Sequence, residues 1–295
     1  MAVPALAAAA DASSVAWWTW PLALFVVSFA IGVVAVLAGV GGGVLFVPVV
    51  AGFFPFHLDF VRSAGLLLAL SGALSAGPAL LRSGLASLRL AMPLALVGSI
   101  TSIAGAMLGL ALSTEVVQTL LGVTILAIAA VMAWGRSAHE SKPPEPDTLA
   151  RLFGMRGVFV DGATGREVVW TAHRTPAGLA AFAGIGVLAG LFGLGAGWAN
   201  VPALNLLMGV PLKLAVGTSG LVLSIIDTSA AWVYLNRGAV LPMLVAPSII
   251  GVMLGAKVGV RALRRAPARV VRRVVLGLLL VAGARALLKG LGLWS

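Results

Sequence analysis

Long runs of hydrophobic residues fill most of this chain, and polar residues interrupt them at intervals. Each long run holds about 20 residues, the length that a helix needs to cross the hydrocarbon core of a bilayer. The runs cover residues 17–38, 60–81, 90–112, 116–134, 176–194, 214–235, 239–260 and 274–293. This pattern predicts an all-α polytopic membrane protein.

Two glycine-rich stretches interrupt the apolar pattern at matching places. Residues 37–48 read L-A-G-V-G-G-G-V-L-F-V-P, and residues 191–202 read L-F-G-L-G-A-G-W-A-N-V-P. Glycine costs about 1 kcal/mol in a helix interior and proline about 3 kcal/mol, so each stretch is expected to break its helix. At an offset of 154 residues, Gly39, Gly41, Gly43 and Pro48 align with Gly193, Gly195, Gly197 and Pro202. A short apolar piece follows each break, at residues 44–54 and 198–208.

Other short motifs also recur between the two halves of the chain. R-S-G at 82–84 matches N-R-G at 236–238, G-A-M-L-G at 105–109 matches G-V-M-L-G at 251–255, and S-A-G at 63–65 matches T-S-G at 218–220. We therefore predict two homologous transmembrane repeats, residues 17–134 and 176–293. Together they would hold about 8–10 membrane segments, two of them short and either broken or hairpin-like.

The composition agrees with a membrane protein and narrows the chemistry. Of the 295 residues, 60% are hydrophobic and 10% are charged, whereas a soluble domain carries about 25% charged residues. The absence of cysteine excludes disulfides and thiolate metal sites. Because the three histidines are scattered, we expect no metal site and no cofactor.

The net charge of +11 comes largely from clustered basic residues. Six of the 20 Lys and Arg residues lie within residues 261–273, and six more lie within residues 136–174. Basic clusters beside membrane helices are typical cytoplasmic anchors, so the charge indicates topology rather than nucleic-acid binding. Residues 1–15 carry no Lys or Arg and are expected to be a disordered lead rather than a signal peptide.

Residues 135–175 form the only long polar stretch, which we expect to be a cytoplasmic linker. Within it, residues 157–171 place the β-rich pieces V-F-V and R-E-V-V-W-T around a glycine-containing turn. This pattern predicts a small β-hairpin. A lone hairpin is marginally stable, so it would pack on the membrane domain.

The basic loops also bear on the orientation of the repeats. If both are cytoplasmic, an even number of crossings separates residue 175 from residue 261, and counting the short piece gives four. Each half then holds five segments, and odd-membered halves insert in opposite orientations, as inverted repeats. A piece of about 11 residues spans only half a bilayer. The alternative is therefore a re-entrant leg, which would change the parity and face one basic loop outward. We favour two hairpins that dip toward the centre from opposite sides.

The paired breaks are the first candidates for chemistry. A helix broken at mid-membrane directs backbone N–H groups and the positive end of its dipole toward a bound anion. The candidate binding residues are Gly41, Gly42, Gly43, Gly195 and Gly197, with Pro48 and Pro202 as gating hinges. The alternative role for these glycines is close helix packing. Two matched breaks, each followed by a proline, favour a binding site.

Asp227 is the one acidic residue well inside a predicted span. A carboxylate in a membrane is costly, so Asp227 is a candidate carrier of a coupling proton. The alternative is a structural ion pair with Lys257, the one lysine inside a neighbouring span.

Small polar residues along the second long span of each half could hydrogen-bond an oxyanion. The candidates are Ser71, Ser75, Thr218, Ser219 and Ser224, together with Asn200 in the second short piece and Trp198 as a cover for the pocket. Any one hydroxyl could instead serve an interhelical hydrogen bond. Arg62 and Arg82, at span ends, are candidate anion guides, although terminal arginines often snorkel to headgroups. No nucleophile elbow, Walker pattern or metal cluster is present in the sequence, so we expect no enzyme.

The duplicated G-x-G-G-G-x-x-x-x-P and G-x-G-A-G-x-x-N-x-P stretches, with T-S-G and G-x-M-L-G, resemble the TauE/SafE family of sulfite exporters over about residues 25–290. The chain departs in having Ala196 where the first half has Gly42, and in its long polar insert. The resemblance implies a secondary transporter of a small sulfur-containing anion in the cytoplasmic membrane. Sulfite, sulfoacetate or another organosulfonate would be the substrate.

We further expect alternating access and proton coupling. An anion channel for small oxyanions and a membrane scaffold are the competing functions. The expected partners are the anion and the lipid bilayer, with no nucleic acid, and a homodimer is compatible with the sequence.

Overall fold

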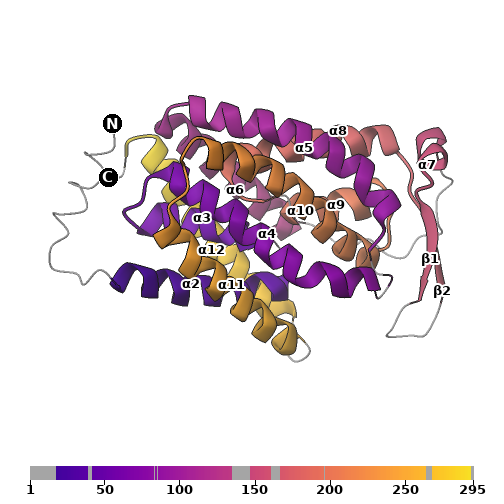
Figure 1. Ribbon diagram of the computed structural model, residues 1–295, viewed down its shortest axis with the longest axis horizontal. Helices are drawn as coiled ribbons and strands as arrows, with labels where there is room; N and C mark the ends of the chain where they lie inside the picture. The colour runs from indigo at the N-terminus through magenta and orange to yellow at the C-terminus, as the bar shows by residue number, and fades with distance from the viewer. Residues whose placement is uncertain are drawn as a thin grey trace.

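The computed structural model describes residues 18–38, 42–82, 84, 86–134, 147–160, 167–195, 197–263 and 268–293. Its helices lie side by side along the long axis of the molecule, and two strands lie across one end (Figure 1). We name the end that carries β1 (Arg156–Val160) and β2 (Glu167–Thr171), at the right of Figure 1, the β end. The opposite end is the far end.

Each long apolar run of the sequence is helical in the described residues, with bounds that differ from the prediction by a few residues. The first half contains α2 (Thr19–Ala38), α3 (Gly42–Phe53), α4 (Leu58–Arg82), α5 (Leu88–Ala111) and α6 (Thr114–Trp134). The second half contains α8 (Thr175–Phe192), α9 (Gly197–Pro202), the π-helical η1 (Ala203–Leu207), α10 (Leu212–Asn236), α11 (Pro242–Leu263) and α12 (Ala268–Gly290).

Three described helical stretches are long and apolar enough to cross a membrane: Leu88–Ala111, Thr175–Phe192 and Leu214–Asn236. Shorter apolar stretches are Thr19–Ala35, Gly42–Phe53, Thr114–Ala127 and Pro242–Val258. Large apolar side chains such as Leu96, Ile100 and Trp232 are exposed on the outside of the bundle. Such exposure is expected where a helix faces lipid rather than water. The chain is therefore a predominantly helical membrane protein.

Glycines bring α2 and α11 into backbone contact. A methyl group on Gly251 of α11 would lie 2.5 Å from the Phe25 carbonyl oxygen of α2, and Gly255 lies in the same way against Phe29. Small residues let membrane helices approach until dispersion forces and Cα–H···O contacts act along the seam. From one contact to the next, the residue numbers increase on both helices, so α2 and α11 run parallel.

The same kind of seam joins α5 to α8. A methyl group on Gly105 of α5 would overlap the Val187 carbonyl oxygen of α8, and one on Gly109 would lie 2.8 Å from the Leu191 carbonyl oxygen. These two helices therefore also run parallel. Both seams join a helix of the first half to a helix of the second half, so neither half packs as an independent domain.

A third glycine seam joins α6 to α12. A methyl group on Gly122 would lie 2.6 Å from the Leu287 backbone nitrogen, and one on Gly290 would lie 2.5 Å from the Thr119 backbone nitrogen. From one contact to the next along this seam, the residue numbers increase on α6 and decrease on α12, so the two helices run antiparallel. The seam closes the bundle at the side where the two halves end.

A small insert covers the β end. β1 and β2 pair antiparallel, with Val158 opposite Val169. Trp170 of β2 is buried in a cluster that includes Leu90 and Met208, so one face of the strand pair packs on the bundle. A short helix, α7 (Thr148–Leu152), precedes β1. From the sequence we predict only a linker there, so α7 is an element that the prediction lacks.

Asp147 fastens this insert to the bundle. Its Oδ1 accepts a hydrogen bond from the Ala150 N–H (2.7 Å), and its Oδ2 accepts one from the Thr175 N–H at the start of α8. Burial disfavours the charged carboxylate, but the two N–H donors outweigh that effect and hold the pKa of Asp147 below its ordinary value of 3.8. One carboxylate thus holds the starts of α7 and α8 together.

We expect Asp147→Asn to loosen this junction, because the amide offers one oxygen where the carboxylate offers two. The loss of one hydrogen bond should cost about 1 kcal/mol, measured as faster hydrogen exchange at Ala150 and Thr175. In the wild type, this stabilisation is present above pH 3.8 and is lost as the pH falls through the lowered native pKa. The variant should lack that acid-dependent step.

Glu167→Gln on β2 is the matched control for this experiment, because Glu167 is exposed. It should leave the exchange rates at the junction unchanged. Equal protection of Ala150 and Thr175 in wild type and Asp147→Asn at neutral pH would contradict the fastening role.

Candidate functional site

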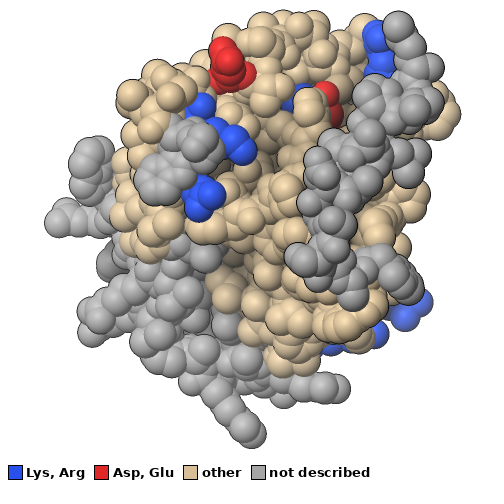
Figure 2. Space-filling view, turned by 90° about the vertical axis from the view of Figure 1, so that its left-hand side faces the viewer, with Lys and Arg blue, Asp and Glu red and all other residues tan. Residues whose placement is uncertain are grey.

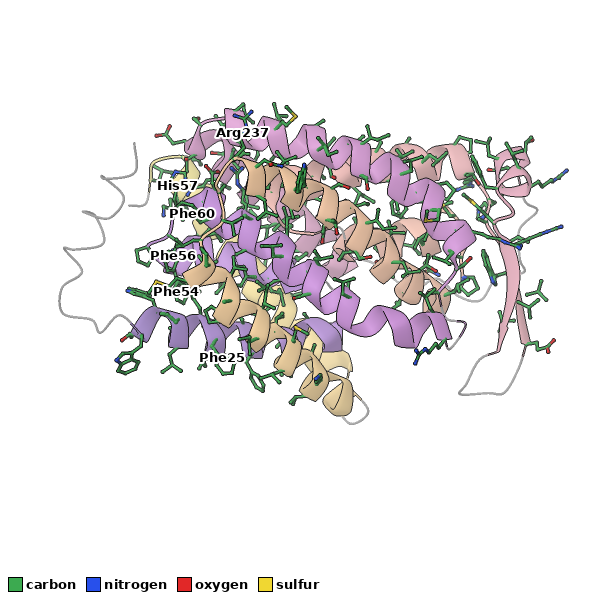
Figure 3. The ribbon with its side chains drawn as sticks, viewed as in Figure 1. Phe25, Phe54, Phe56, His57, Phe60 and Arg237 are labelled. Carbon is green, nitrogen blue, oxygen red and sulfur yellow. The ribbon has the colours of Figure 1, made fainter. Side chains whose placement is uncertain are left out.

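α3 runs back toward the end of the molecule at which α2 begins. Trp20 at the start of α2 packs on Phe54 and Phe56 after the end of α3, with ring centroids 5.8 and 6.1 Å apart. Phe54, Phe56 and His57 lie together at the far end (Figure 3). The α2–α3 hairpin therefore starts and finishes at the far end.

The second hairpin, α8 with α9 and η1, starts and finishes at the β end. The His173 N–H, just before α8, donates to the Met208 carbonyl oxygen just after η1 (3.1 Å). The His173 Nδ1 atom also lies 2.9 Å from this oxygen. The two hairpins thus enter the bundle from opposite ends (Figure 1).

The two breaks meet inside the bundle. A methyl group on Gly43, in the first turn of α3, would lie 2.5 Å from the Leu194 carbonyl oxygen of the second break and 2.8 Å from the Gly65 carbonyl oxygen of α4. Gly65 itself leaves no room for a methyl group beside the Gly193 carbonyl oxygen and Val47. The backbones of the first break, α4 and the second break are therefore in direct contact.

The second break needs glycine for its backbone shape as well. Gly193 ends α8 with φ +66°, and Gly195 has φ +71°. A Cβ disfavours this left-handed region, whereas glycine enters it freely. The Gly193 N–H also closes the last turn of α8 on the Ala189 carbonyl oxygen. The G-x-G pattern here sets the chain reversal.

Arg62 lies beside the second break and is only 1% exposed. Its guanidinium donates from Nη1 to the Leu191 carbonyl oxygen and from Nη2 to the Gly109 carbonyl oxygen, both at 3.0 Å. Nη2 also pairs with the Asp59 carboxylate. Carbonyl groups in the last turn of a helix have no hydrogen-bond partner within the helix. A cation placed there stabilises the helix, because the C-terminal end of the helix dipole is negative. Arg62 therefore joins the ends of α5 and α8 to α4.

Tyr234 of α10 completes this clamp. Its hydroxyl donates to the Gly190 carbonyl oxygen (2.9 Å), and its ring centroid lies 5.6 Å from Arg62 Cζ. Side chains from α4 and α10 thus hold two consecutive carbonyls directly before the second break. Tyr234 is not among the residues predicted from the sequence, where its only signal is that the chain contains a single tyrosine.

The two arginines proposed as anion guides lie far from each other along α4. Arg62 uses both terminal nitrogens on protein groups inside the bundle. Arg82 is exposed and is the last residue of α4, at the β end. In this structure Arg62 serves helix packing, and only Arg82 is placed to meet a solute from outside.

Asp227 faces the second break from α10. Its side chain is fully buried, and its Oδ2 lies 3.0 Å from the position that a methyl group on Gly195 would take. Lys257, the alternative partner, is exposed on α11, and no ion pair joins it to Asp227 among the described residues. The carboxyl group is therefore placed against the glycine backbone of the break.

Asn200 lies one turn into α9 and is fully buried. Neither its amide oxygen nor its amide nitrogen has a hydrogen-bond partner in the described part of the chain. Leaving a buried polar group unpaired costs about 1–3 kcal/mol. Such a side chain points to a polar ligand.

The predicted hydroxyl ligands are directed elsewhere. Ser71 and Ser224 each donate to a carbonyl oxygen three residues earlier in their own helix, both at 2.8 Å. Thr218 accepts a hydrogen bond from the Ser87 N–H (3.1 Å), which joins α10 to the start of α5, and Ser219 is buried next to it. Of the predicted polar ligands whose side chains the structure describes, only Asn200 and Asp227 lie at the second break.

The two aligned prolines lie in different local structures. Pro48 is buried inside α3, which continues through it as an α-helix. At Pro202, α9 gives way to the π-helical η1. The backbone is therefore irregular directly after Pro202, where the hydrogen-bond pattern changes from α-helical to π-helical. The irregularity that the hinge prediction requires is therefore present at Pro202, whereas α3 has none at Pro48.

Other predicted residues need only a short account. Gly42 and Gly197 begin α3 and α9. Gly39 and Gly41 lie outside the described residues, and so do the side chains of Ser75 and Trp198. Gly65, which the sequence analysis uses only as repeat evidence, belongs to the contact between the breaks.

We expect Gly65→Ala to destabilise the protein, because the new methyl group would overlap the Gly193 carbonyl oxygen and Val47. Overpacking a buried contact costs about 1–3 kcal/mol, which thermal unfolding in detergent would detect. Gly72→Ala, two turns later in α4, is the control, because no described atom lies within 4 Å of its added methyl group. Alanine's helix preference should leave its stability equal or higher. Similar melting temperatures for the two variants would refute the packing role of Gly65.

Comparison with known proteins agrees with the resemblance drawn from the sequence. The family model described as Sulfite exporter TauE/SafE matches residues 24–286, nearly the whole chain. The matched region contains both breaks, Arg62, Asn200 and Asp227. No curated protein and no solved structure gives a significant match. The family match implies membrane transport of sulfite or a related anion, and the chain belongs to the sulfite exporter TauE/SafE family.

Proposed function

We propose that this protein is a secondary active transporter that moves sulfite, sulfoacetate or another small organosulfonate across the cytoplasmic membrane. The observation that carries the proposal is the meeting of two helix breaks, with the buried and unpaired amide of Asn200 one turn away. The family match supplies the class of anion. The geometry supports a binding place where the α2–α3 hairpin meets the α8–α9 hairpin.

Helix directions support an inverted repeat. In the alignment of the two halves, α2 corresponds to α8, α4 to α10 and α5 to α11. The parallel pairs are α2 with α11 and α5 with α8, so the first segment of each half packs on the fourth segment of the other. In Figure 1, α2 runs from the far end and α8 runs from the β end. Corresponding helices of the two halves therefore start at opposite ends of the bundle, as a two-fold axis in the membrane plane requires.

The same directions support a cytoplasmic β end. Each hairpin has two legs and returns to the end from which it started, so the number of crossings between α8 and α12 stays even. The start of α8 and the end of α11 then both face the β end. Of the basic residues that the structure describes, Arg151, Arg156 and Arg174 lie beside the start of α8, and Arg261 lies in the last turn of α11. Basic residues favour the cytoplasmic side. A re-entrant hairpin therefore does not place one basic loop outside, contrary to the parity argument made from the sequence.

Neutral donors would meet the charge of the anion. The terminal nitrogens of Arg62 are engaged by Leu191, Gly109 and Asp59. The 12-residue α3 begins at Gly42 at the break, with its first-turn N–H groups and the positive end of its dipole there. The Asn200 amide would add a further N–H donor. A sulfur oxyanion held by such donors needs no cationic side chain.

Asp227 supports proton coupling. An ionised carboxylate beside Gly195 would repel an anion bound at the breaks, whereas a protonated carboxyl would not. Anion binding would then favour uptake of a proton by Asp227, and loss of the proton would favour anion release. One residue could in this way link the movement of the anion to that of a proton.

The closed contact between the breaks favours a transporter over the competing anion channel. Gly43 lies directly against the Leu194 carbonyl oxygen, whereas a channel conducts through an open path. Opening the site would require one hairpin to move relative to the other. The irregular backbone from Pro202 into η1 is a natural point for such a movement.

Anion binding can be tested by thermal unfolding of the purified protein with sulfite, sulfoacetate, taurine, sulfate and acetate. A ligand at 100 times its dissociation constant stabilises the native state by about 2.7 kcal/mol. We expect a selective shift from one sulfur oxyanion, and Asn200→Ala should remove most of that shift. Asn236→Ala, exposed at the end of α10, is the matched control. Equal shifts from all five solutes, or a full shift in Asn200→Ala, would count against the site.

Proton coupling can be tested with Asp227→Asn in proteoliposomes. The amide resembles the protonated carboxyl but cannot release a proton. We therefore expect it to lose uptake driven by a pH gradient while retaining anion exchange at equal pH. Lys257→Gln, exposed on α11, should retain both activities. Unchanged pH-driven uptake in Asp227→Asn at normal protein levels would remove Asp227 from the proton path.

A further inference from the structure

In the described part of the chain, the cationic side chains nearest the two breaks along the helices are either paired or directed away from them. Arg62, beside the second break, pairs with the Asp59 carboxylate, so the two side chains together carry no net charge. Lys257 lies on the outer face of α11, where Leu254 and Val258 are also exposed. The four residues of the breaks that lie outside the described ranges are Gly39, Val40, Gly41 and Ala196, which carry no charge.

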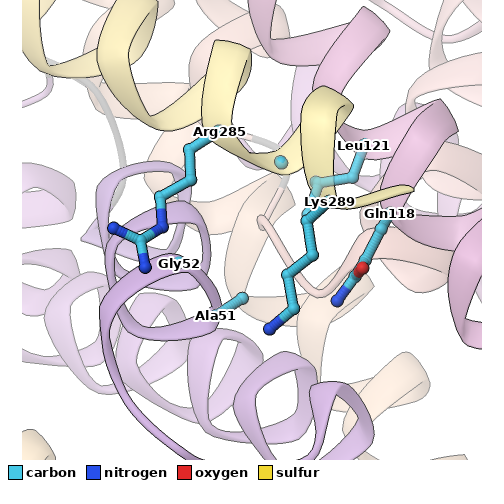
Figure 4. A pocket seen from close by; sticks show the side chains of 7 residues that line it. Ala51, Gly52, Gln118, Leu121, Arg285 and Lys289 are labelled. Atoms are coloured by element: carbon cyan, nitrogen blue, oxygen red, sulfur yellow. The ribbon is translucent and has the colours of Figure 1, made fainter. Parts of the chain in front are cut away.

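The surface cations of the far end lie the length of a helix away from the breaks. α3 begins at the first break and ends at Phe53, and its 12 residues measure about 18 Å. The Arg285 guanidinium lies over the Phe53 ring, with Cζ 4.4 Å from the ring centroid. Arg285 and Lys289 border a small hollow where α3 and α12 end and α6 begins (Figure 4). Figure 2 looks onto this end and shows Lys and Arg on its surface. These charges can attract an anion from solution, but they do not line the breaks.

The described groups at the breaks therefore offer an anion less than one full positive charge. The N-terminus of a helix is equivalent to roughly half an elementary charge, and the first turn of α3 supplies one such end. The fully buried Asn200 amide is a neutral hydrogen-bond donor. Asp227, also fully buried, adds a negative charge when it is ionised and none when it is protonated.

An anion that enters this place exchanges its hydration water for these groups. The electrostatic cost of leaving water grows with the square of the charge, so a dianion loses about four times as much hydration energy as a monoanion of the same size. Neutral donors and one helix end can offset a single negative charge. A second negative charge would stay uncompensated inside the bundle, and an ionised Asp227 would repel it further.

We propose that the breaks select sulfur oxyanions that carry a single negative charge and discriminate against dianions. This inference rests on the proposed function and narrows its substrate class to hydrogensulfite and to sulfonates without a second ionised acid group. Sulfate and the sulfite dianion fall outside that class, and so does sulfoacetate while its carboxyl group is ionised. Asn200 determines this specificity, because it supplies a donor without supplying a charge.

The test compares solutes that differ in charge but hardly in size. Methanesulfonate carries one negative charge where sulfate carries two, and the amide of sulfoacetate carries one where sulfoacetate carries two. Thermal unfolding of the full chain in detergent, at one neutral pH and constant ionic strength, gives the affinity for each solute. We expect the singly charged member of each pair to bind at least about 100-fold more tightly. Exchange in proteoliposomes should follow the same order.

A cation at the breaks should relax this discrimination. Asn200→Lys places an ammonium group where the neutral amide lies, and a nearby cation attracts a dianion about twice as strongly as a monoanion. We expect the ratio of affinities within each pair to fall at least about 10-fold. Arg237→Gln, exposed at the far end (Figure 3), is the matched control and should leave the ratio unchanged. If Asn200→Lys does not fold, the two solute pairs measured on the wild type decide the question.

Equal affinities within both pairs would overturn the charge selectivity while leaving the proposed transport of sulfur anions intact. A ratio that stays constant in folded Asn200→Lys, or that falls in Arg237→Gln, would also overturn it, because the discrimination would then arise away from the breaks. If none of the four solutes stabilises the protein or exchanges across the membrane, the proposed function fails together with this inference.

Discussion

Direct backbone contact between two interrupted helices is the constraint on which this structure depends. Gly43 lies against the Leu194 carbonyl oxygen, and Gly65 lies against the Gly193 carbonyl oxygen. A side chain at Gly43 would separate the two hairpins, and one at Gly65 would separate α4 from the second break. In a bilayer, broken backbone is tolerated only where protein groups or a water-filled cavity surround it. Each break therefore shields the backbone of the other from lipid, and α4 and α10 supply the protein groups that pack against the second break.

The two halves share this backbone plan but differ in their charged residues. In the alignment that pairs residues 63–65 with 218–220, Arg62 corresponds to Gly217 and Asp227 to Gly72. The cation of the first half holds the carbonyls of α8 before the second break, whereas the acid of the second half faces Gly195. Under the proposed mechanism, the Arg62 clamp fixes the end of α8, and the movement begins later in the second hairpin, at the irregular backbone from Pro202 into η1.

The sequence predicts the helices, the two breaks and the buried acid because each depends on local composition. Runs of apolar residues of membrane-spanning length, glycines with a proline, and one carboxylate inside a span are visible without knowing any contact. The position of Arg62 is not visible in this way, because its carbonyl partners lie 47 and 129 residues away in the chain. The same holds for α7, since Asp147 caps it while binding Thr175, 28 residues later. The serine hydroxyls, which turn back to their own helices, could not be assigned from spacing alone.

In the proposed mechanism, the transported anion binds where the two breaks meet. The most direct measurement is an experimental structure of the protein saturated with the anion that stabilises it most, with the sulfur atom located. We expect the anion between the first turn of α3 and the Asn200 amide, within hydrogen-bond distance of both. An anion bound elsewhere, with the contact between Gly43 and Leu194 unchanged and Asn200 still unpaired, would contradict it.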